Sequence, residues 1–206
     1  MVPEEAEPLS RRAESSEATR AALIEAAREL FAHHGYNAVS TQEIVRRARV
    51  SRGALYHHFR DKRDLFRAVF EQVDQELVQQ LAQAGLGIED PWAQLNAGWK
   101  AFLDACVKQQ AVQRIGFVEA PAVLGWAQWR QLDSAYALGL VRTVLENAMQ
   151  SGMIQQHPVA PLAHVILGAL NEAGMLIANA KDPEATRGEV ADALTYLFDG
   201  LRSRQN

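Results

Sequence analysis

Basic side chains gather in one short window of this chain, and their density suits binding to a polyphosphate. Residues 40–67 hold eight lysines and arginines against Glu43, Asp61 and Asp64, which gives the window a net charge of +5. The whole chain carries −4, and residues 71–206 hold 9 basic against 15 acidic side chains. A nucleic acid requires a local basic patch and not a basic total. A solvated charged surface without a partner is the competing interpretation of the patch by itself.

Residue types that perform nucleophilic or metal chemistry form no recognisable site. The single cysteine, Cys106, falls on an apolar helical face, so we expect a buried structural thiol and not a nucleophile or redox sensor. Neighbours on a helix diverge by about 100°, so neither His33–His34 nor His57–His58 can share a metal. The sequence has no Gly-x-Ser-x-Gly elbow and no phosphate-binding glycine loop. It therefore predicts no enzyme, no cofactor and no metal.

Length and composition bound the class of protein. The chain has 206 residues, of which 48% are hydrophobic and 22% are charged, enough to bury the core of one or two domains. It contains no uninterrupted run of about 18 apolar residues. Residues 1–16 are polar and lack the apolar segment of a secretory signal. We expect a cytoplasmic protein with no membrane partner.

The apolar positions repeat at helical spacing along almost the whole chain. They predict an all-α fold of about nine helices. Residues 1–16 are expected to form a flexible arm, followed by a first helix that ends at Gly35. Residues 17–66 and 67–206 are predicted to be two domains, the first of which carries the basic window.

Helix-start signals divide the basic window into short helices. Ser40 and Glu43 have the spacing of a capping box, Ser51 is placed to cap the next helix, and Asp61 the one after it. Two helices of about two turns, joined by a tight turn at Arg49, are typical of a helix-turn-helix. The second of them would enter the major groove of DNA.

The exposed residues predicted for that second helix suit contact with DNA. Arg52 can donate to O6 and N7 of guanine or to a phosphate, and Gly53 permits close approach of the backbone. Donors on the exposed surface and near helix starts could hold phosphates. These candidates are Thr41, Tyr56, His57 and Lys62.

Further along, turn and cap residues predict the remaining helices. Asp90 followed by proline starts one helix, and Asp182 followed by proline starts the last. Pro121 is expected to separate a short helix from the long helix after it.

Many residues of the first 66 follow one known pattern of caps, core positions and polar positions. They are Thr19, Arg20, Ala26, Phe31, Gly35, Tyr36, Ser40, Thr41, Ile44, Ala48, Val50, Ser51, Gly53, Leu55, Tyr56, His58, Phe59, Lys62, Leu65 and Phe66. In this spacing they resemble the tetracycline-repressor (TetR) family of bacterial transcription regulators. The resemblance covers about residues 18–66. One departure is Arg49, where the family usually has glycine, so the turn must adopt a less favourable backbone angle or a different geometry.

The resemblance implies a homodimer, formed through the last two helices, that represses transcription from a palindromic operator in double-stranded DNA. It implies release by a small molecule bound in the C-terminal domain. Position by position, it assigns phosphates to Thr41, Tyr56, His57 and Lys62, and base edges to Arg52, Gly53 and Ala54. His58 matches a family histidine that is often partly buried.

Aromatic residues cluster in the second half of the chain, where an apolar effector pocket is one interpretation and an ordinary core is the other. Asn171 interrupts an apolar helix, and its partner could be a ligand, a second subunit or a neighbouring helix. The candidate pocket residues are Trp99, Phe102, Phe117, Trp126, Trp129, Asp133, Tyr136 and Asn171. A small apolar or aromatic effector would fit them. The alternative is a DNA-binding or protein-interaction dimer without an effector, which a filled or missing pocket would favour.

Overall fold

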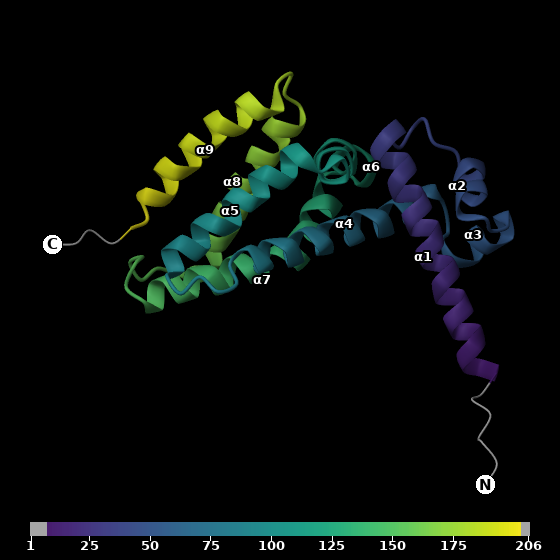
Figure 1. Cartoon of the computed structure of the whole chain (residues 1–206), viewed down its shortest axis with the longest axis horizontal. Coiled ribbons are helices and arrows are strands. Elements are labelled where there is room, and N and C mark those ends of the chain that lie inside the picture. The colour runs from purple at the N-terminus through teal and green to yellow at the C-terminus, as the bar shows by residue number, and fades with distance from the viewer. Residues whose placement is uncertain (1–7, 203–206) are drawn as a thin grey trace, which may run out of the picture. The chain divides into compact units, whose positions relative to one another are not determined.

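The computed structural model describes residues 8–202, and side chains from residue 13 onward. This part of the chain forms nine α-helices and one π-helical segment, and the one extended pairing in it is an isolated bridge between Ile154 and Arg202. The predicted all-α fold is therefore confirmed. The chain divides into two compact units, Met1–Val69 and Phe70–Asn206, which Figure 1 colours from purple to yellow along the chain.

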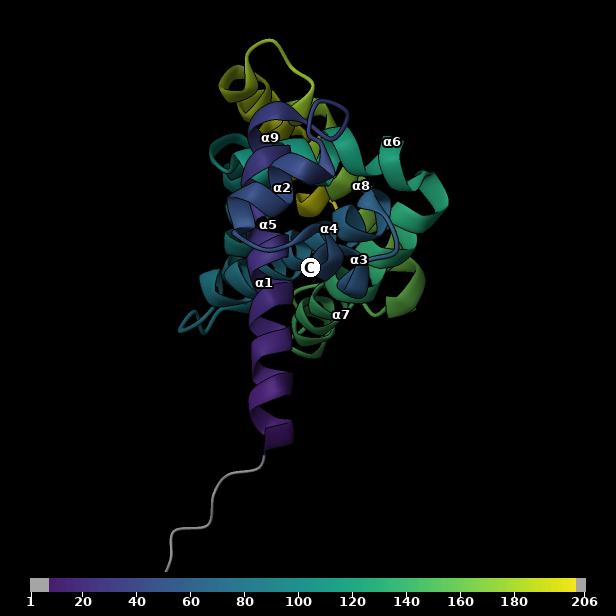
Figure 2. The same ribbon diagram turned by 90° about the vertical axis from the view of Figure 1, so that its right-hand side faces the viewer.

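Three helices and the start of a fourth make up the first unit. Their bounds are α1 Pro8–His34, α2 Thr41–Ala48, α3 Arg52–His58 and α4 Lys62–Ala84. One fully buried side chain from each helix meets in the core: Phe31, Ile44, Leu55 and Phe66. The rings of Phe31 and Phe66 lie 5.4 Å apart. Helix α1 packs against both short helices, α2 and α3, which lie near its upper part in Figure 2; this is the arrangement of a helix-turn-helix.

Side-chain caps start the short helices where the sequence predicts them. Ser40 Oγ accepts a hydrogen bond from the Glu43 backbone N–H at 3.2 Å, and Glu43 Oε2 accepts one from the Ser40 N–H at 2.7 Å. Ser51 Oγ accepts from the Ala54 N–H at 3.1 Å. Asp61 Oδ1 accepts from the Asp64 N–H at 2.8 Å. Each cap satisfies an amide that the helix cannot pair internally, which fixes where the helix begins.

The first helix begins earlier than predicted. It starts at Pro8, so the expected irregular arm is wrong for residues 8–16, and residues 1–7 of that arm lie outside the described part of the chain. Proline is tolerated in a first helical turn, and residues 9–16 contain neither glycine nor another proline. Most side chains of residues 13–17 are exposed. Helix propensity therefore extends α1 here without an apolar stripe.

Arg49 ends α2 in the left-handed conformation, with φ 57° and ψ 38°. The following Val50 N–H donates to the Val45 carbonyl at 3.0 Å and closes the helix end. No other non-glycine residue in the described chain has a positive φ. The less favourable backbone angle expected at this turn is thus confirmed. Such an angle strains an L-residue because its Cβ approaches the carbonyl oxygen.

Arg49→Gly is expected to raise the free energy of unfolding by about 0.5–1 kcal/mol, since glycine adopts this angle without strain. Urea unfolding followed by circular dichroism measures the change. Arg46→Gly is the matched control. It places the same substitution inside α2 and should lower stability by about 1 kcal/mol. A loss of stability in both variants would contradict the assigned strain.

The second unit is a bundle built around α8. Its elements after α4 are α5 Pro91–Lys108, η1 Val112–Glu119, α6 Ala120–Leu124, α7 Trp126–Gln150, α8 Val159–Ala178 and α9 Pro183–Asp199. Helix α8 packs against α5, α7, η1 and α9, and Figure 1 shows it passing behind α5, with α9 beside them. Asp90 and Asp182 cap α5 and α9 as predicted, each accepting a backbone hydrogen bond at 3.0 Å.

The break before α7 lies at Gly125 and not at Pro121. Pro121 stands in the first turn of α6, which follows η1 without a break in the helical backbone. Gly125 adopts φ 80° and ψ 150°, an angle that ends α6 and starts α7. The short helix expected before Pro121 is η1. It is π-helical, so each of its backbone hydrogen bonds spans one more residue than in an α-helix.

Helix α8 is long and apolar enough, by length and composition, to cross a membrane. It is the one described helix with that property. The core helix of a globular protein meets the same criterion, and α8 buries Ala163, Ile166, Leu167 and Ile177 within the bundle. The central place of α8 in the second unit therefore explains the apolar side chains of its buried face.

Candidate nucleic-acid interface and interior cavity

Three of the predicted DNA contacts meet on one exposed surface of the first unit. The Arg52 guanidinium lies 5.6 Å from the centre of the Tyr56 ring, one turn further along α3. The side chains of Arg52 and Thr41 hydrogen-bond to the Tyr56 hydroxyl and lower its pKa. Tyr56 remains 46% exposed. The starts of α2 and α3 thus present a hydroxyl, a phenol and a guanidinium side by side, which are groups that bind phosphates and base edges.

Gly53 lies in the first turn of α3, next to these donors. It is exposed, and an added Cβ would meet only Ser51 Oγ, at an ordinary 3.7 Å. Its φ is not in the left-handed region. Neither packing nor backbone angle within the chain therefore requires glycine here. Ala54, the third predicted base-edge residue, is half-buried.

Lys62 and the two histidines flank this surface. Lys62 Nζ lies 4.1 Å from the centre of the Tyr36 ring, so its charge is held at the start of α4. His57 is exposed, and its ring contacts that of His58 edge-on with centroids 5.1 Å apart. His58 is half-buried, and burial lowers its pKa, with a further contribution from His57. This accords with a packing role for His58 and an outward position for His57.

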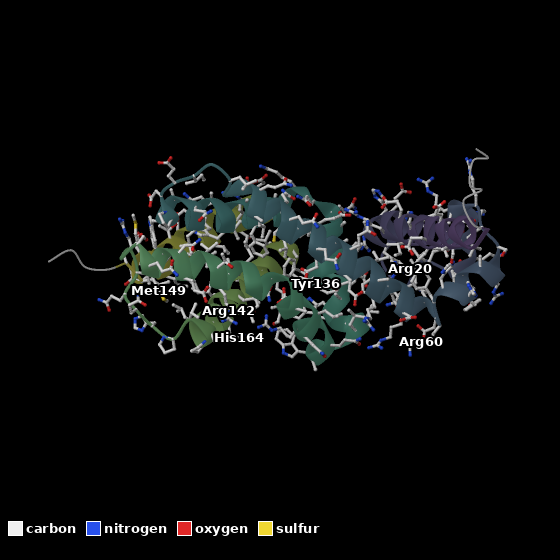
Figure 3. All side chains as sticks on the ribbon, turned by 90° about the horizontal axis from the view of Figure 1, so that it is seen from below. Arg20, Arg60, Tyr136, Arg142, Met149 and His164 are labelled. Atoms are coloured by element: carbon white, nitrogen blue, oxygen red, sulfur yellow. The ribbon has the colours of Figure 1, made fainter. Side chains whose placement is uncertain are left out.

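The basic window separates into two places. Arg46, Arg47 and Arg49 border a surface depression beside the end of α1, together with His34. Arg47 there forms an ion pair with Glu29. The basic side chains near α3 are a different set, and they lie where helices begin. The net charge of the window therefore overstates the charge that one ligand could meet. Elsewhere in the unit, the Arg20 guanidinium covers the Phe59 ring at 5.5 Å; Arg20 is labelled in Figure 3.

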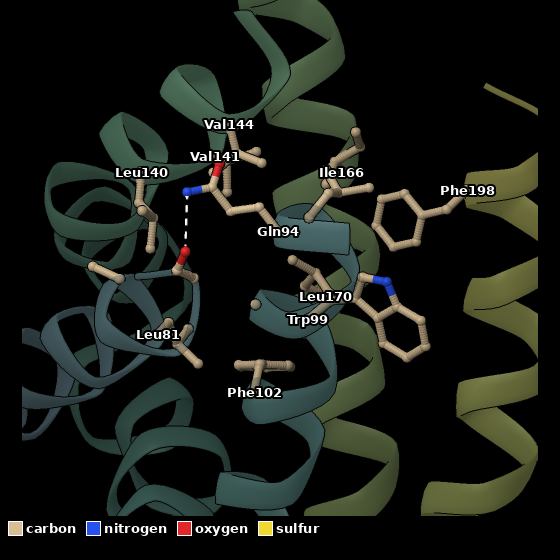
Figure 4. Close-up of a pocket in the computed structure, with 14 residues that line it drawn as sticks. Leu81, Gln94, Trp99, Phe102, Leu140, Val141, Val144, Ile166, Leu170 and Phe198 are labelled. Carbon is tan, nitrogen blue, oxygen red and sulfur yellow. Dashed lines mark hydrogen bonds between the residues drawn. The ribbon is translucent and has the colours of Figure 1, made fainter. Parts of the chain in front are cut away.

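The second unit contains an apolar cavity of about 100 Å³. Figure 4 shows Trp99 and Phe102 of α5 on one side and residues of α4, α7, α8 and α9 around them. The Trp99 ring stacks on Phe198 at 5.9 Å, and its Nε1 donates to Asn96 Oδ1 at 3.0 Å. At one edge, Gln94 Nε2 donates to the Gly85 carbonyl at 3.4 Å.

Of the eight predicted pocket residues, Trp99 and Phe102 line this cavity. Sequence reasoning missed its aliphatic walls, which lie on the regular apolar stripes of α4, α7 and α8. That periodicity identifies a buried stripe without telling which part of it borders a void. The aliphatic side chains on these walls include Leu81, Leu140, Val144, Ile166 and Leu170.

Phe117 and Trp129 are buried beside the cavity in an aromatic cluster. Phe117 packs edge-on against Phe102 at 5.9 Å and against Trp129 at 6.4 Å. An added Cβ on Gly174 would lie 2.6 Å from the Phe117 ring, so glycine makes room for it. Trp126 is 58% exposed next to Trp129, and Tyr136 on α7 is half-buried (Figure 3).

Asp133 and Asn171 are both buried and bonded to each other. Asn171 Nδ2 donates to Asp133 Oδ2 at 2.6 Å, and Arg130 Nη1 lies 3.4 Å from the same oxygen. A neighbouring helix is therefore one partner of Asn171 among the alternatives left open by the sequence. Burial raises the pKa of Asp133, although these two donors oppose the shift.

Asp74 on α4 is a buried carboxyl that sequence reasoning missed. It is 9% exposed, and its Oδ2 has no hydrogen-bond partner within the described residues. Burial, followed by repulsion from Asp133, raises its pKa to about 8. The apolar periodicity of α4 could have identified this buried position, because Asp74 stands four residues after Phe70 and seven before Leu81 on the apolar stripe of the helix.

Cys106 is fully buried, as predicted, and burial raises the pKa of its thiol. A thiol in this state is protonated at neutral pH and inert.

Both units match known families of sequence. Residues 23–69 match the family described as bacterial regulatory proteins, tetR family. Residues 92–201 match the tetracyclin repressor-like C-terminal domain. A TetC protein of transposon Tn10 from Escherichia coli is 24% identical over 176 residues, covering 85% of this chain and 88% of that protein.

Two further proteins have a higher sequence identity to this chain. A probable acrEF/envCD operon repressor of Escherichia coli is 42% identical over 80 residues, which is 38% of this chain and 36% of that protein. The crystal structure of a transcriptional regulator from Pectobacterium atrosepticum has a TM-score of 0.84 and 32% identity. It covers 94% of this chain and 98% of its own.

Proposed function

Because the chain belongs to the TetR family of bacterial transcription regulators, we propose that it is a cytoplasmic, homodimeric repressor. It binds a palindromic operator and is released by a small apolar or aromatic effector. The observation that carries DNA binding is the exposed group of Thr41, Arg52 and Tyr56 on two short capped helices. The operon repressor similar to part of this chain supports repression as the direction of control.

In this proposal α3 lies in the major groove. Arg52, Gly53 and Ala54, in its first turn, face base edges. Thr41, Tyr56, His57 and Lys62 hold phosphates on either side. Free amides at the starts of α2 and α4 add to the attraction for these anions.

Gly53→Ala is expected to stabilise the protein slightly and to weaken operator binding. Alanine favours the helix by about 0.5–1 kcal/mol, and the chain has room for the methyl group. A base pair held against this backbone would leave no room for that methyl group. Urea unfolding and operator titration on the same sample separate the two effects. Unchanged operator affinity would mean that no base approaches Gly53.

The last two helices supply a surface for the second subunit. Val165 and Leu176 of α8 and Tyr196 and Leu197 of α9 are each more than half exposed. Apolar patches of this kind mark protein contacts. An isologous dimer through these helices would present two copies of α3 to successive turns of DNA.

The cavity favours a regulator with an effector over a dimer without one, because the side chains of Trp99 and Phe102 line the space and do not fill it. An apolar cavity of about 150 Å³ holds benzene, so the present volume of about 100 Å³ must widen slightly to admit a ring. Leu81 on its wall and Lys62 at the DNA surface belong to one helix, α4. A ligand that displaces the last turns of α4 could thus alter the DNA contacts at its start.

Selection of bound duplexes from random DNA, at a stated salt concentration, tests this function. Enrichment of a palindrome supports a dimeric sequence reader and yields the probe for effector screening. Failure to enrich any sequence, with the protein folded and dimeric, would refute operator binding by the free protein. An operator complex that no apolar ligand dissociates would favour the dimer without an effector.

A further inference from the structure

Three polar side chains from three helices are buried together in the second unit. Asp74 of α4, Asp133 of α7 and Asn171 of α8 are 9%, 6% and 3% exposed. Asn171 and Asp133 are bonded at 2.6 Å. The Oδ2 atom of Asp74 is left without a donor among the described residues. A buried polar atom in this state costs about 1–3 kcal/mol, so a reason for its presence is needed.

Charge is also unbalanced in this cluster. Asp74 and Asp133 repel each other, and Arg130 places a charged donor 3.4 Å from Asp133. With both carboxyls ionised, Asp74, Asp133 and Arg130 together carry one net negative charge. A buried negative charge of this kind is stabilised when a cation is placed beside it.

The cluster and the cavity lie along the same helix faces. Asp74 precedes Leu81 on α4 by seven residues, and Asp133 precedes Leu140 on α7 by seven. Both leucines line the cavity. Seven residues are two helical turns, which bring each carboxyl onto the face of its leucine about 10.5 Å away along the axis. Two helices independently give the same offset.

Aromatic rings pack near both the cavity and the carboxyl cluster. Phe102 lines the cavity and packs against Phe117, which packs against Trp129. Trp129 stands one turn before Asp133 on α7. The order along α7 is therefore Trp129, Asp133 and then Leu140, so Asp133 lies between that ring and the cavity wall.

We propose that Asp74 and Asp133 form the polar end of the effector site and bind the ammonium group of an arylalkylamine, whose apolar part lies in the cavity beside Trp99 and Phe102. This rests on the proposed function, since it names the ligand class of that same site. The ammonium group supplies the donor that Asp74 Oδ2 lacks and the positive charge that the pair lacks. Its alkyl chain spans the two-turn offset between the cavity leucines and the carboxyl pair.

The charge of the cluster discriminates among ligands. A carboxylate ligand would add a third negative charge and is rejected. An alcohol could donate a hydrogen bond to Asp74 but would leave the charge unbalanced. The order of affinity expected for ligands of one shape is therefore amine, alcohol, acid.

Three isosteric probes test the site: 3-phenylpropylamine, 3-phenylpropan-1-ol and 3-phenylpropanoate. Calorimetric titration of the full chain without DNA keeps the result independent of operator binding. The variant is Asp74→Asn. Glu76→Gln on the exposed side of the same helix is the matched control, because it makes the same change of acid to amide outside the cluster.

We expect the amine to bind wild type and Glu76→Gln alike, and Asp74→Asn about tenfold or more weakly. The alcohol should bind all three proteins equally. In wild type the affinity for the amine should rise about tenfold from pH 6 to pH 7, because Asp74, with its pKa raised to about 8, must release its proton to pair with the cation. An alkylammonium group itself stays charged over this range.

An amine that binds no more tightly than the alcohol would overturn the proposal, as would an affinity that Asp74→Asn leaves unchanged. Binding of none of the probes to folded protein would overturn it too. Each of these results can occur in a protein that selects a palindrome normally. Failure of the ligand class is therefore distinguishable from failure of the proposed function.

Discussion

Asp74→Asn is expected to be more stable than wild type at pH 8 by on the order of 5 kcal/mol, from about four pKa units at 1.36 kcal/mol each. The reason is the burial of this carboxyl, which raises its pKa from 3.8 to about 8. Ionisation inside the bundle is therefore costly. Asparagine has nearly the same shape and carries no charge at any pH.

The gain should depend on pH in a defined direction. Between the ordinary pKa of 3.8 and about 8, the folded protein keeps the proton on Asp74 and the unfolded chain has lost it. The folded state thus binds more protons, and wild type loses stability as the pH rises through this window. The difference between variant and wild type should shrink toward pH 4.

Urea unfolding at pH 5, 6, 7 and 8 measures this difference. Glu76→Gln, an exposed position on the same helix, should follow wild type at every pH. A variant that is less stable than wild type at pH 8 would show that Asp74 is ionised and paired in the folded protein.

Arg52→Lys and Lys62→Ala are expected to weaken operator binding in two different ways. Lysine keeps the charge of Arg52 but loses the forked pair of donors that reads guanine. We expect a loss of about 2 kcal/mol per dimer, about 30-fold, on the operator alone. Affinity for random DNA and the salt dependence should not change.

Lys62→Ala removes a phosphate contact from each subunit and should weaken binding to operator and random DNA alike. The slope of log affinity against log salt should become shallower by about 2 per dimer. Titration of both duplexes at several salt concentrations separates the two variants. If Lys62→Ala spared random DNA, its placement at a phosphate would be wrong. Circular dichroism controls for loss of the contact with Tyr36.

The first unit was predictable because local rules determine most of it. The caps at Ser40 and Ser51 and the turn at Arg49 involve neighbours within five residues, and the structure has the caps where the sequence predicts them. The start of α1 was not predictable, because an exposed helical extension has no apolar periodicity to detect. The assignments of individual residues to DNA stay predictions.

The interior of the second unit was less predictable because contacts between distant segments determine it. Phe117 and Trp129 were proposed for the pocket, yet the space that Gly174 leaves draws Phe117 into the aromatic cluster. The apolar stripe of α4 places Asp74 in the interior, but it does not show that α7 puts Asp133 near it. Periodicity places a side chain on a helix face, but the neighbouring helices decide what it meets.

The uneven burial of the tryptophans makes this protein its own spectroscopic probe. Trp126 is 58% exposed, while Trp99 and Trp129 are 3% and 1% exposed. A soluble quencher such as acrylamide should therefore remove the emission of Trp126 first and spare that of Trp99 and Trp129, with the half-buried Trp92 in between. The light that remains comes in part from Trp99, whose ring borders the cavity. Entry of a ligand could then be followed by fluorescence lifetime without attaching any dye.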